Sequence, residues 1–288
     1  MKSSGKRCDL PFSPQETLNK FMDHFEAIRK KPKHDEWEQR GRALFAEKVL
    51  GLIQAHLPIP MVLPAFPFKS SNTTHKVLSR HADMAEQLAL DALGAYCAQV
   101  RQYYPPGASL VLVSDGRVYN SQFEIELDLV LVFQREVKKM NKSPDIHVVG
   151  LGDLLPETED KDMRSCLLGL FGQPMHKIDD ILKTNADFNR VYVGFKKFMA
   201  EELSFPPNIT AKQRNLRCAG AAREMMKSND AYGKLVECIF SNHLRLSIHA
   251  HCNVTKIGIN LVNMTPGSDM QWGTPWHNCA LLRKSGTW

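Results

Sequence analysis

The feature that most constrains the fold is an alternation of short apolar runs with longer helical patterns. Residues 108–113 and 146–151 are apolar runs of strand length, rich in β-branched side chains. Helical periodicity fills residues 83–104 before the first run and 125–140 between the two runs. Helix, strand, helix and strand at this spacing predict an α/β fold, with a Rossmann-like, mainly parallel sheet flanked by helices.

The N-terminal quarter is predicted from the same patterns. Residues 14–57 carry two apolar helical stripes separated by a charged break, and we expect residues 1–57 to be a helical extension packed on a catalytic domain of residues 58–288. Residues 58–68 contain four prolines, which predicts an extended segment that is not a central strand.

The C-terminal part reads as a helical stretch followed by strands. Residues 162–240 are mostly helical in pattern. Residues 244–251 then alternate between polar and apolar side chains, and a second alternating run, 256–261, follows after four residues. This spacing predicts a C-terminal β-hairpin region. The polar face of the first run would carry Arg245, Ser247, His249 and His251.

Composition excludes several classes of protein. The 288 residues are 43% hydrophobic, as in ordinary globular chains, and no apolar run approaches the roughly 18 residues of a membrane span. No secretory signal precedes the first helix, and the seven cysteines form no C-x-x-C pair, so a cytoplasmic protein without disulfides is expected. The net charge of +6 suits an anionic partner, but no basic run with interleaved aromatic residues favours nucleic acid.

The first candidate site is the polar cluster Lys69, Ser70, Ser71 and Asn72, which follows the proline-rich segment. An ammonium group with several hydroxyls near a helix start can bind an anion, and a lysine can also form a Schiff base. The alternative is a plain helix cap beside a solvated lysine.

The second candidate site follows the strand at residues 108–113. Ligands of open α/β sheets collect at the carboxyl ends of strands, where Asp115 could act as a base or hold an amine and Arg117 could clamp a phosphate. An Asp-Gly turn without function is the alternative.

The third and fourth candidate sites contain the histidines. His249 and His251 have the spacing of a metal-ligand pair, with His277, Asp115 or Cys252 as a third ligand, or they lie on a solvent-facing strand. Near the C-terminus, Thr274, Trp276 and His277 could form an aromatic pocket with an acid or base, or a tryptophan anchor in the core.

Taken in order, four stretches of the chain resemble the isocyanide (isonitrile) synthase family, also called the pyoverdine/dityrosine biosynthesis family. They are residues 63–72, 114–119, 245–249 and 274–277. The chain departs from the family pattern at Ser71, where relatives usually carry proline, and at Tyr119-Asn120-Ser121, where they tend to carry an aspartate.

The resemblance implies a lyase-type, carbon–carbon-cleaving enzyme of secondary metabolism. It would convert the α-amino group of an L-amino acid to an isonitrile, with ribulose 5-phosphate as the one-carbon donor. Tyrosine and tryptophan are the leading candidates for the amino acid. A formamide product also lies within the family. No cofactor and no metal are implied, and an oxygenase acting on the product is the expected downstream partner.

The same resemblance implies roles for the clustered residues. Asp115, His249 and His277 would share the acid and base steps with Lys69 as a further catalytic residue. The expected substrate-binding residues are Ser70, Ser71, Asn72, Arg117, Arg245, Ser247, Thr274 and Trp276. Two other classes stay open: a metal-dependent enzyme using His249, His251 and His277, and a non-enzymatic module that binds nucleic acid or another anion.

Overall fold

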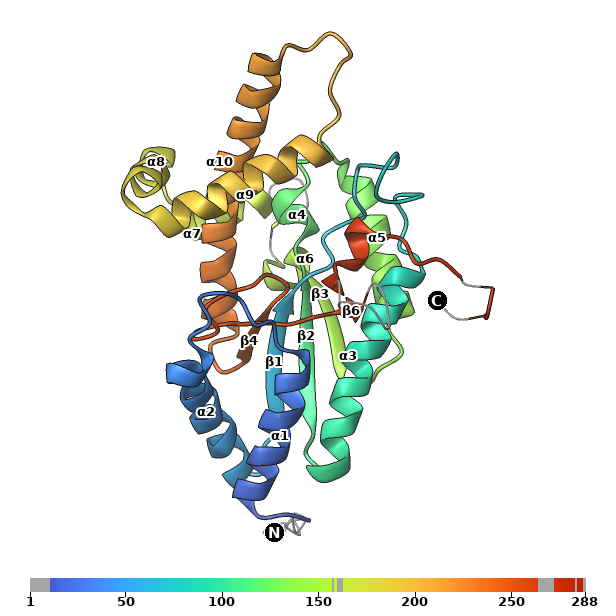
Figure 1. Cartoon of the computed structure of the whole chain (residues 1–288), viewed down its shortest axis with the longest axis vertical. Helices are drawn as coiled ribbons and strands as arrows, with labels where there is room; N and C mark the ends of the chain where they lie inside the picture. Colours follow the sequence, from blue (N-terminus) through green and yellow to red (C-terminus); the bar gives the residue numbers. More distant parts are fainter. Residues whose placement is uncertain (1–10, 157, 160–162, 264–271, 283, 287–288) are drawn as a thin grey trace.

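The computed structural model describes residues 11–156, 158–159, 163–263, 272–282 and 284–286. In this part of the chain a parallel sheet of five strands has the order β3-β2-β1-β4-β5 (Figure 1). Its strands are β1 (Ile59–Pro64), β2 (Ala108–Ser114), β3 (Ile146–Gly150), β4 (Leu244–Ser247) and β5 (Ile257–Gly258). The chain adds β2 and β3 on one side of β1, and β4 and β5 on the other. This reversal of direction makes the carboxyl ends of β1 and β4 the topological switch point of the sheet, where open α/β sheets bind ligands in a crevice; we call this region the β1–β4 crevice.

Helices cover both faces of the sheet (Figure 1). The helical elements are α1 (Pro14–Ile28), η1 (Trp37–Gly41), α2 (Arg42–Gln54), α3 (Met84–Tyr103), α4 (Gly116–Tyr119), α5 (Leu127–Met140), α6 (Leu151–Leu154), α7 (Met163–Phe171), α8 (Met175–Thr184), α9 (Ala186–Glu202), α10 (Ala211–Ile239) and η3 (Pro275–His277). Buried side chains of α1, α2, α3 and α5 pack on one face of the sheet, and those of α4, α7 and α10 pack on the other. The α/β architecture expected from the alternation of patterns is therefore confirmed.

The proline-rich segment contradicts its prediction, because β1 is the central strand of the sheet. The backbone N–H groups of Ile59 and Ala65 donate to the carbonyl oxygens of Gly107 and Val113, on the β2 side. Because backbone groups alternate in direction along a strand, the even-numbered positions between them are those whose N–H would point toward β4. The strand β4 pairs with β1 only at Met61 and Val62. Pro60 and Pro64 thus lie outside the paired stretch, where a missing N–H costs no hydrogen bond.

The predicted hairpin between residues 244–251 and 256–261 is also wrong. The strand β4 ends at Ser247, where the Oγ atom accepts a hydrogen bond from the backbone N–H of His249, and β5 then pairs with β4 in parallel. His249 and His251 therefore lie in the connection between the two strands. The antiparallel pair of this region lies further on, between β6 (Val262–Asn263) and β7 (Trp272–Gly273).

The N-terminal segment is integrated with the sheet. Side chains such as Phe21 and Phe25 of α1 lie in the same hydrophobic cluster as the strands β1 and β2. The connection from α1 to α2 runs along β5, where Arg29 forms a β-bridge with Ile259. The division of the chain at residue 57 stays a prediction. None of the described helices combines the length and the hydropathy that crossing a membrane requires.

Gly116 positions the turn after β2 against the loop that follows β1. A Cβ atom at this residue would lie 2.1 Å from the carbonyl oxygen of Pro67 and 2.6 Å from Val130 Cγ1. We expect Gly116→Ala to lower the free energy of unfolding by about 2–4 kcal/mol, because backbone atoms must move to accept the methyl group.

Gly220 is the matched control, because an added Cβ in this exposed part of α10 has no atom within 4 Å. Gly220→Ala should leave stability unchanged or raise it by up to about 1 kcal/mol. Urea unfolding of both variants measures the difference, and equal stabilities would show that the close approach at Gly116 does not constrain the turn.

Candidate functional site

Three of the four predicted clusters follow parallel strands at the carboxyl edge of the sheet. The loop with Lys69 follows β1, the turn with Asp115 follows β2, and the connection with His249 follows β4. The fourth cluster, on η3, docks on the β1 loop, where the backbone N–H of Ser70 donates to the carbonyl oxygen of Trp276 at 2.8 Å. The edge next to the β1–β4 crevice therefore collects these polar residues from distant parts of the sequence.

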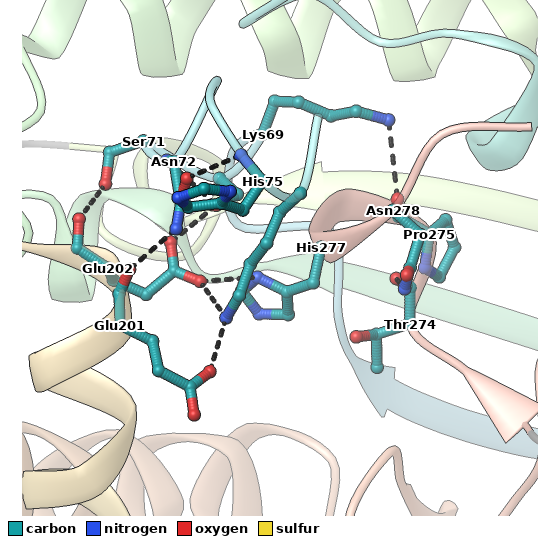
Figure 2. A network of polar contacts seen from close by, with 12 residues as sticks. Lys69, Ser71, Asn72, His75, Glu201, Glu202, Thr274, Pro275, His277 and Asn278 are labelled. Atoms are coloured by element: carbon teal, nitrogen blue, oxygen red, sulfur yellow. Dashed lines mark hydrogen bonds and ion pairs between the residues drawn. The ribbon is translucent and has the colours of Figure 1, made fainter. Parts of the chain in front are cut away.

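Lys69 is buried, with 1% of its surface exposed. Its Nζ atom lies 2.7 and 2.9 Å from the two carboxylate oxygens of Glu86 and 2.9 Å from Asp83 Oδ2. It also donates to the carbonyl oxygen of Pro275 at 3.3 Å (Figure 2). Burial raises the pKa of Glu86 to about 7, against the opposing effect of the Lys69 charge. Lys69 thus ties the β1 loop to the start of α3 and to η3.

Glu202, the last residue of α9, is the centre of a second network (Figure 2). Its buried carboxylate accepts hydrogen bonds from Ser70 Oγ at 2.5 Å and Lys76 Nζ at 2.8 Å, and lies 3.4 Å from His277 Nδ1. Burial alone would raise the pKa of Glu202, but His277, Lys76 and Ser70 together lower it to about 2. The carboxylate is therefore charged at neutral pH and lies within ion-pair distance of His277 Nδ1, which has no hydrogen-bond partner among the described residues, so this charge favours one orientation of the imidazole.

Backbone groups at the end of α9 hold the same loop. Ser71 Oγ donates to the carbonyl oxygen of Glu202 at 2.6 Å, and Asn72 Nδ2 donates to that of Glu201 at 2.9 Å. The β1 loop is thus fixed from both sides, by α3 through Lys69 and by α9 through these bonds.

Asp115 follows β2 and Arg245 lies in β4, on the other side of β1, and their charges attract each other. Asp115 Oδ1 is buried without a hydrogen-bond partner among the described residues, and so is Arg245 Nη1. Burial raises the pKa of Asp115 to about 7 and lowers that of Arg245. The rings of Tyr119 and Tyr232 pack edge to face beside them, and the charges of Asp115 and Arg245 act on both hydroxyl groups. Unpaired buried polar atoms and a carboxyl group that titrates near neutrality are typical of a functional site.

The histidines after β4 carry neutral rings at pH 7. His249 reaches solvent, but the surrounding protein and the charges of Lys30, Lys256 and His277 lower its pKa to about 4. Burial and the charge of Lys256 lower the pKa of His251 to about 3, and its Nε2 atom lies 2.9 Å from Ser247 Oγ. The effect of His277 on His249 links the network around Glu202 to the histidines after β4.

Several expected site residues point elsewhere. Arg117 Nη1 donates to Met163 Sδ of α7 at 2.7 Å, on the β3 side of the turn. Trp276 is buried against Phe66, with ring centroids 5.1 Å apart, and Ser70 is fully buried beside Glu202. The carbonyl oxygen of Thr274 accepts from the side chain of Asn278.

Sequence reasoning did not find Glu202 or Lys30. Neither residue lies in a recognisable motif: Glu202 ends a helix between two other helices, and Lys30 belongs to the charged break after the first helix. For Glu86, the capping-box spacing was a signal, but its pairing with Lys69 needed the tertiary fold. Among the residues with described positions, no three histidine, cysteine, aspartate or glutamate side chains lie close enough together to bind a metal ion. His249, His251 and His277 therefore do not form such a group in this structure.

Comparison with known proteins decides the family. The family model described as "Pyoverdine/dityrosine biosynthesis protein" matches residues 49–288. The chain belongs to this family. It is 34% identical to L-tryptophan isonitrile synthase AmbI2 of Fischerella ambigua over 82% of its own length and 72% of that protein. It is 32% identical to an L-tyrosine isonitrile synthase of Xenorhabdus nematophila, over 81% of its own length and 71% of that protein.

A solved structure of the same family shares the fold. The PvcA protein of Pseudomonas aeruginosa superimposes with a TM-score of 0.82 at 27% identity, covering 91% of this chain and 88% of that protein. The parallel sheet and the helices that position the candidate site are therefore features that this member shares with a solved relative.

The buried pair of Lys69 and Glu86 makes a test of stability. Lys69→Met would leave the Glu86 carboxylate buried without its partner, so we expect the free energy of unfolding to fall by about 3–5 kcal/mol at pH 8. The loss should be smaller at pH 5, because the raised pKa of Glu86 allows it to be protonated there.

The double variant Lys69→Met/Glu86→Gln serves as the control, because it removes the uncompensated charge and keeps the acceptor for the backbone of Asp83. It should recover part of the lost stability in urea unfolding. If the single variant is as stable as the unmodified chain, or if the double variant recovers nothing, the pair does not hold the site together.

The carboxylate of Glu202 makes a second test of stability. Glu202→Gln should lower the free energy of unfolding by about 2 kcal/mol at pH 7, because His277, Lys76 and Ser70 stabilise the charged form and lower its pKa to about 2. The difference should shrink as the pH falls from about 4 toward 2, where the carboxylate of the unmodified chain takes up a proton. Urea unfolding at pH 7 and at pH 3 measures the change. Glu201→Gln is the matched control, since Glu201 also pairs with Lys76 but is 62% exposed. An equal loss of stability in both variants would mean that Glu202 is not the centre of this network.

Proposed function

We propose that this chain is an isonitrile synthase. It converts the α-amino group of an L-amino acid to an isonitrile, and ribulose 5-phosphate supplies the carbon. Tryptophan and tyrosine are the leading candidates for the amino acid. Membership in the family and the names of its relatives support the reaction. Both substrates carry anionic groups, and their condensation needs several proton transfers.

The observation that carries the proposal is the pair formed by Asp115 and Arg245 next to the β1–β4 crevice. Each has a buried polar atom without a partner in the described chain, and a bound substrate would satisfy both. Arg245 is suited to a phosphate or carboxylate because its guanidinium is planar and donates in pairs. Asp115 is suited to proton transfer because its pKa of about 7 lies near the working pH.

The histidines complete the acid and base groups. His249 carries a neutral ring that can accept a proton, and a bound anion would raise its pKa by offsetting the nearby positive charges. His277 is oriented by Glu202 and is the candidate for returning a proton. The order of events would be attack of the amine on the C2 carbonyl of the sugar, loss of water to an imine, and proton transfers that allow both carbon–carbon bonds of C2 to break, C1–C2 and C2–C3. C2 alone then stays on the nitrogen, C1 leaves by itself, and the remaining carbons leave with the phosphate.

Lys69 and Ser70 have a positioning role in this proposal. The donors of Lys69 are engaged by Glu86, Asp83 and Pro275, so the ammonium supports the loop rather than the substrate. Ser71, Asn72, Thr274 and Trp276 form the surrounding frame, and Ser247 orients His251.

Activity is tested directly with the purified chain, L-tryptophan or L-tyrosine, and ribulose 5-phosphate labelled with ¹³C at C2. We expect a labelled isonitrile carbon by NMR, and none when unphosphorylated ribulose replaces the sugar phosphate. If neither these two nor aliphatic L-amino acids give an isonitrile, the proposal is wrong.

The role of Asp115 is tested by Asp115→Asn, which should lower kcat/KM by a factor of about 100 or more. The same variant should be more stable than the unmodified chain by ~2 kcal/mol at pH 8. The reason is that the cost of the buried carboxylate is absent below about pH 4, grows as the pH rises toward the raised pKa of about 7, and is fully present above it.

Thermal unfolding at pH 4 and pH 8 measures this effect, and Asp153→Asn, at a residue that pairs with Lys138 and has a lowered pKa, should show the opposite sign. Full activity of Asp115→Asn would exclude Asp115 from the chemistry.

A further inference from the structure

The connection between α1 and α2 places Lys30 at the carboxyl edge of the sheet. Its backbone N–H donates to the carbonyl oxygen of Gly258 at 2.7 Å, and its own carbonyl accepts from Asn253 Nδ2 at 3.0 Å. Its Nζ atom donates to the carbonyl oxygen of Ile248 at 2.6 Å. In Figure 1 this dark blue connection lies above β4, beside the orange-red chain that follows it. The side chain therefore ends one residue from His249.

The Lys30 ammonium has donors to spare and no counter-ion among the residues that the structure describes. Of its three N–H groups one is bound to Ile248, and in the described chain no carboxylate pairs with it. The side chain is half-buried, and desolvation lowers its pKa. Its neighbour Lys31 is a contrast, since it is 68% exposed and lies 3.7 Å from Glu26. A half-buried lysine whose ammonium is bound to one carbonyl oxygen, with no carboxylate partner among the described residues, points to a charge that arrives with a ligand.

The surroundings of Lys30 are rich in positive charge. Lys30 and Lys256 both act on His249 and His251, and Arg245 acts on His251 and Lys256. The opposing charges on this group are those of Glu237 and Asp115. Three cations, Lys30, Lys256 and Arg245, are thus opposed by two carboxylates in this region.

We propose that Lys30 belongs to the anion-binding subsite of this enzyme, where it and Arg245 hold an anionic substrate group, a phosphate or a carboxylate, beside His249. The proposal rests on the proposed function for the identity of the substrates. Lys30 precedes residue 49, where the match to the family model begins. It is therefore a binding residue supplied by a segment outside the matched region.

The experiment compares Lys30→Met, Lys30→Gln and Lys30→Arg with the control Lys31→Met. Lys30→Met removes the charge, Lys30→Gln removes it while keeping a donor for the Ile248 carbonyl, and Lys30→Arg keeps it. Circular dichroism melts establish which variants are folded, and Lys30→Gln is used wherever Lys30→Met is not. The readouts are kcat and the separate KM values for ribulose 5-phosphate and the L-amino acid.

Loss of one hydrogen bond to a charged group should raise one KM about tenfold or more, with kcat within about threefold. A rise in KM for ribulose 5-phosphate assigns Lys30 to the phosphate, and a rise in KM for the amino acid assigns it to the carboxylate. Lys30→Arg should retain most of the affinity and Lys31→Met all of it. If both KM values of the folded, uncharged variants stay within twofold, or if Lys31→Met has the same effect, the proposal is overturned.

Failure of the proposed function would be recognised separately, because the unmodified chain would then form no isonitrile. Binding of inorganic phosphate, measured by calorimetry, still tests Lys30 in that case. Weaker binding by about tenfold in Lys30→Gln supports the subsite. Equal binding, or none by the unmodified chain, overturns it.

Discussion

The buried ion pair between Lys69 and Glu86 is the contact on which the arrangement of the site depends. It joins the loop after β1, the first turn of α3 and η3 at one point inside the protein. A pair of this kind adds little net stability compared with an apolar contact, but the loss of one partner is costly. The ion pair therefore contributes mainly by fixing the position of the loop after β1. It fixes the loop whose next residues, Ser70 and Ser71, contact Glu202 and thereby set the position of His277.

The region around Arg245 and the histidines after β4 is held in a different way. Burial and nearby positive charges lower the pKa values of His249 and His251. The network around Lys69 and Glu202 thus has its charges closely paired, whereas among the described residues the cations near His249 have fewer carboxylates beside them. The paired network gives the frame its rigidity, and the excess of positive charge is where the proposed anionic substrate would gain most from binding.

Much of the frame could be predicted from local patterns. The apolar run of β2, the position of Asp115 directly after it and the helix that begins near residue 83 are predicted correctly, because each depends on residues close in sequence. The central position of β1 could not be, since Pro60 and Pro64 are acceptable only because β4 is too short to reach them.

The pairing of the strands beside the site, and two of the groups near it, could not be predicted from the sequence either. Hydrophobic alternation predicts the strands β4 and β5 but does not report that they pair in parallel, or that the segment after α1 runs along β5. Glu202 and Lys30 reach the site from helices and connections far away in the chain. The motifs therefore gave the residues at the ends of strands, while the groups that orient or assist them came from the tertiary fold.

The central claim is that an anionic substrate binds beside Arg245 and His249 at the carboxyl edge of the sheet. The most direct measurement is an NMR titration of the ring-labelled histidines with and without ribulose 5-phosphate. The account predicts that the pKa of His249 rises from about 4 when the sugar phosphate binds, while the signals of the distant His147 and His176 do not change. An unchanged pKa of His249 with the sugar phosphate bound would contradict the account.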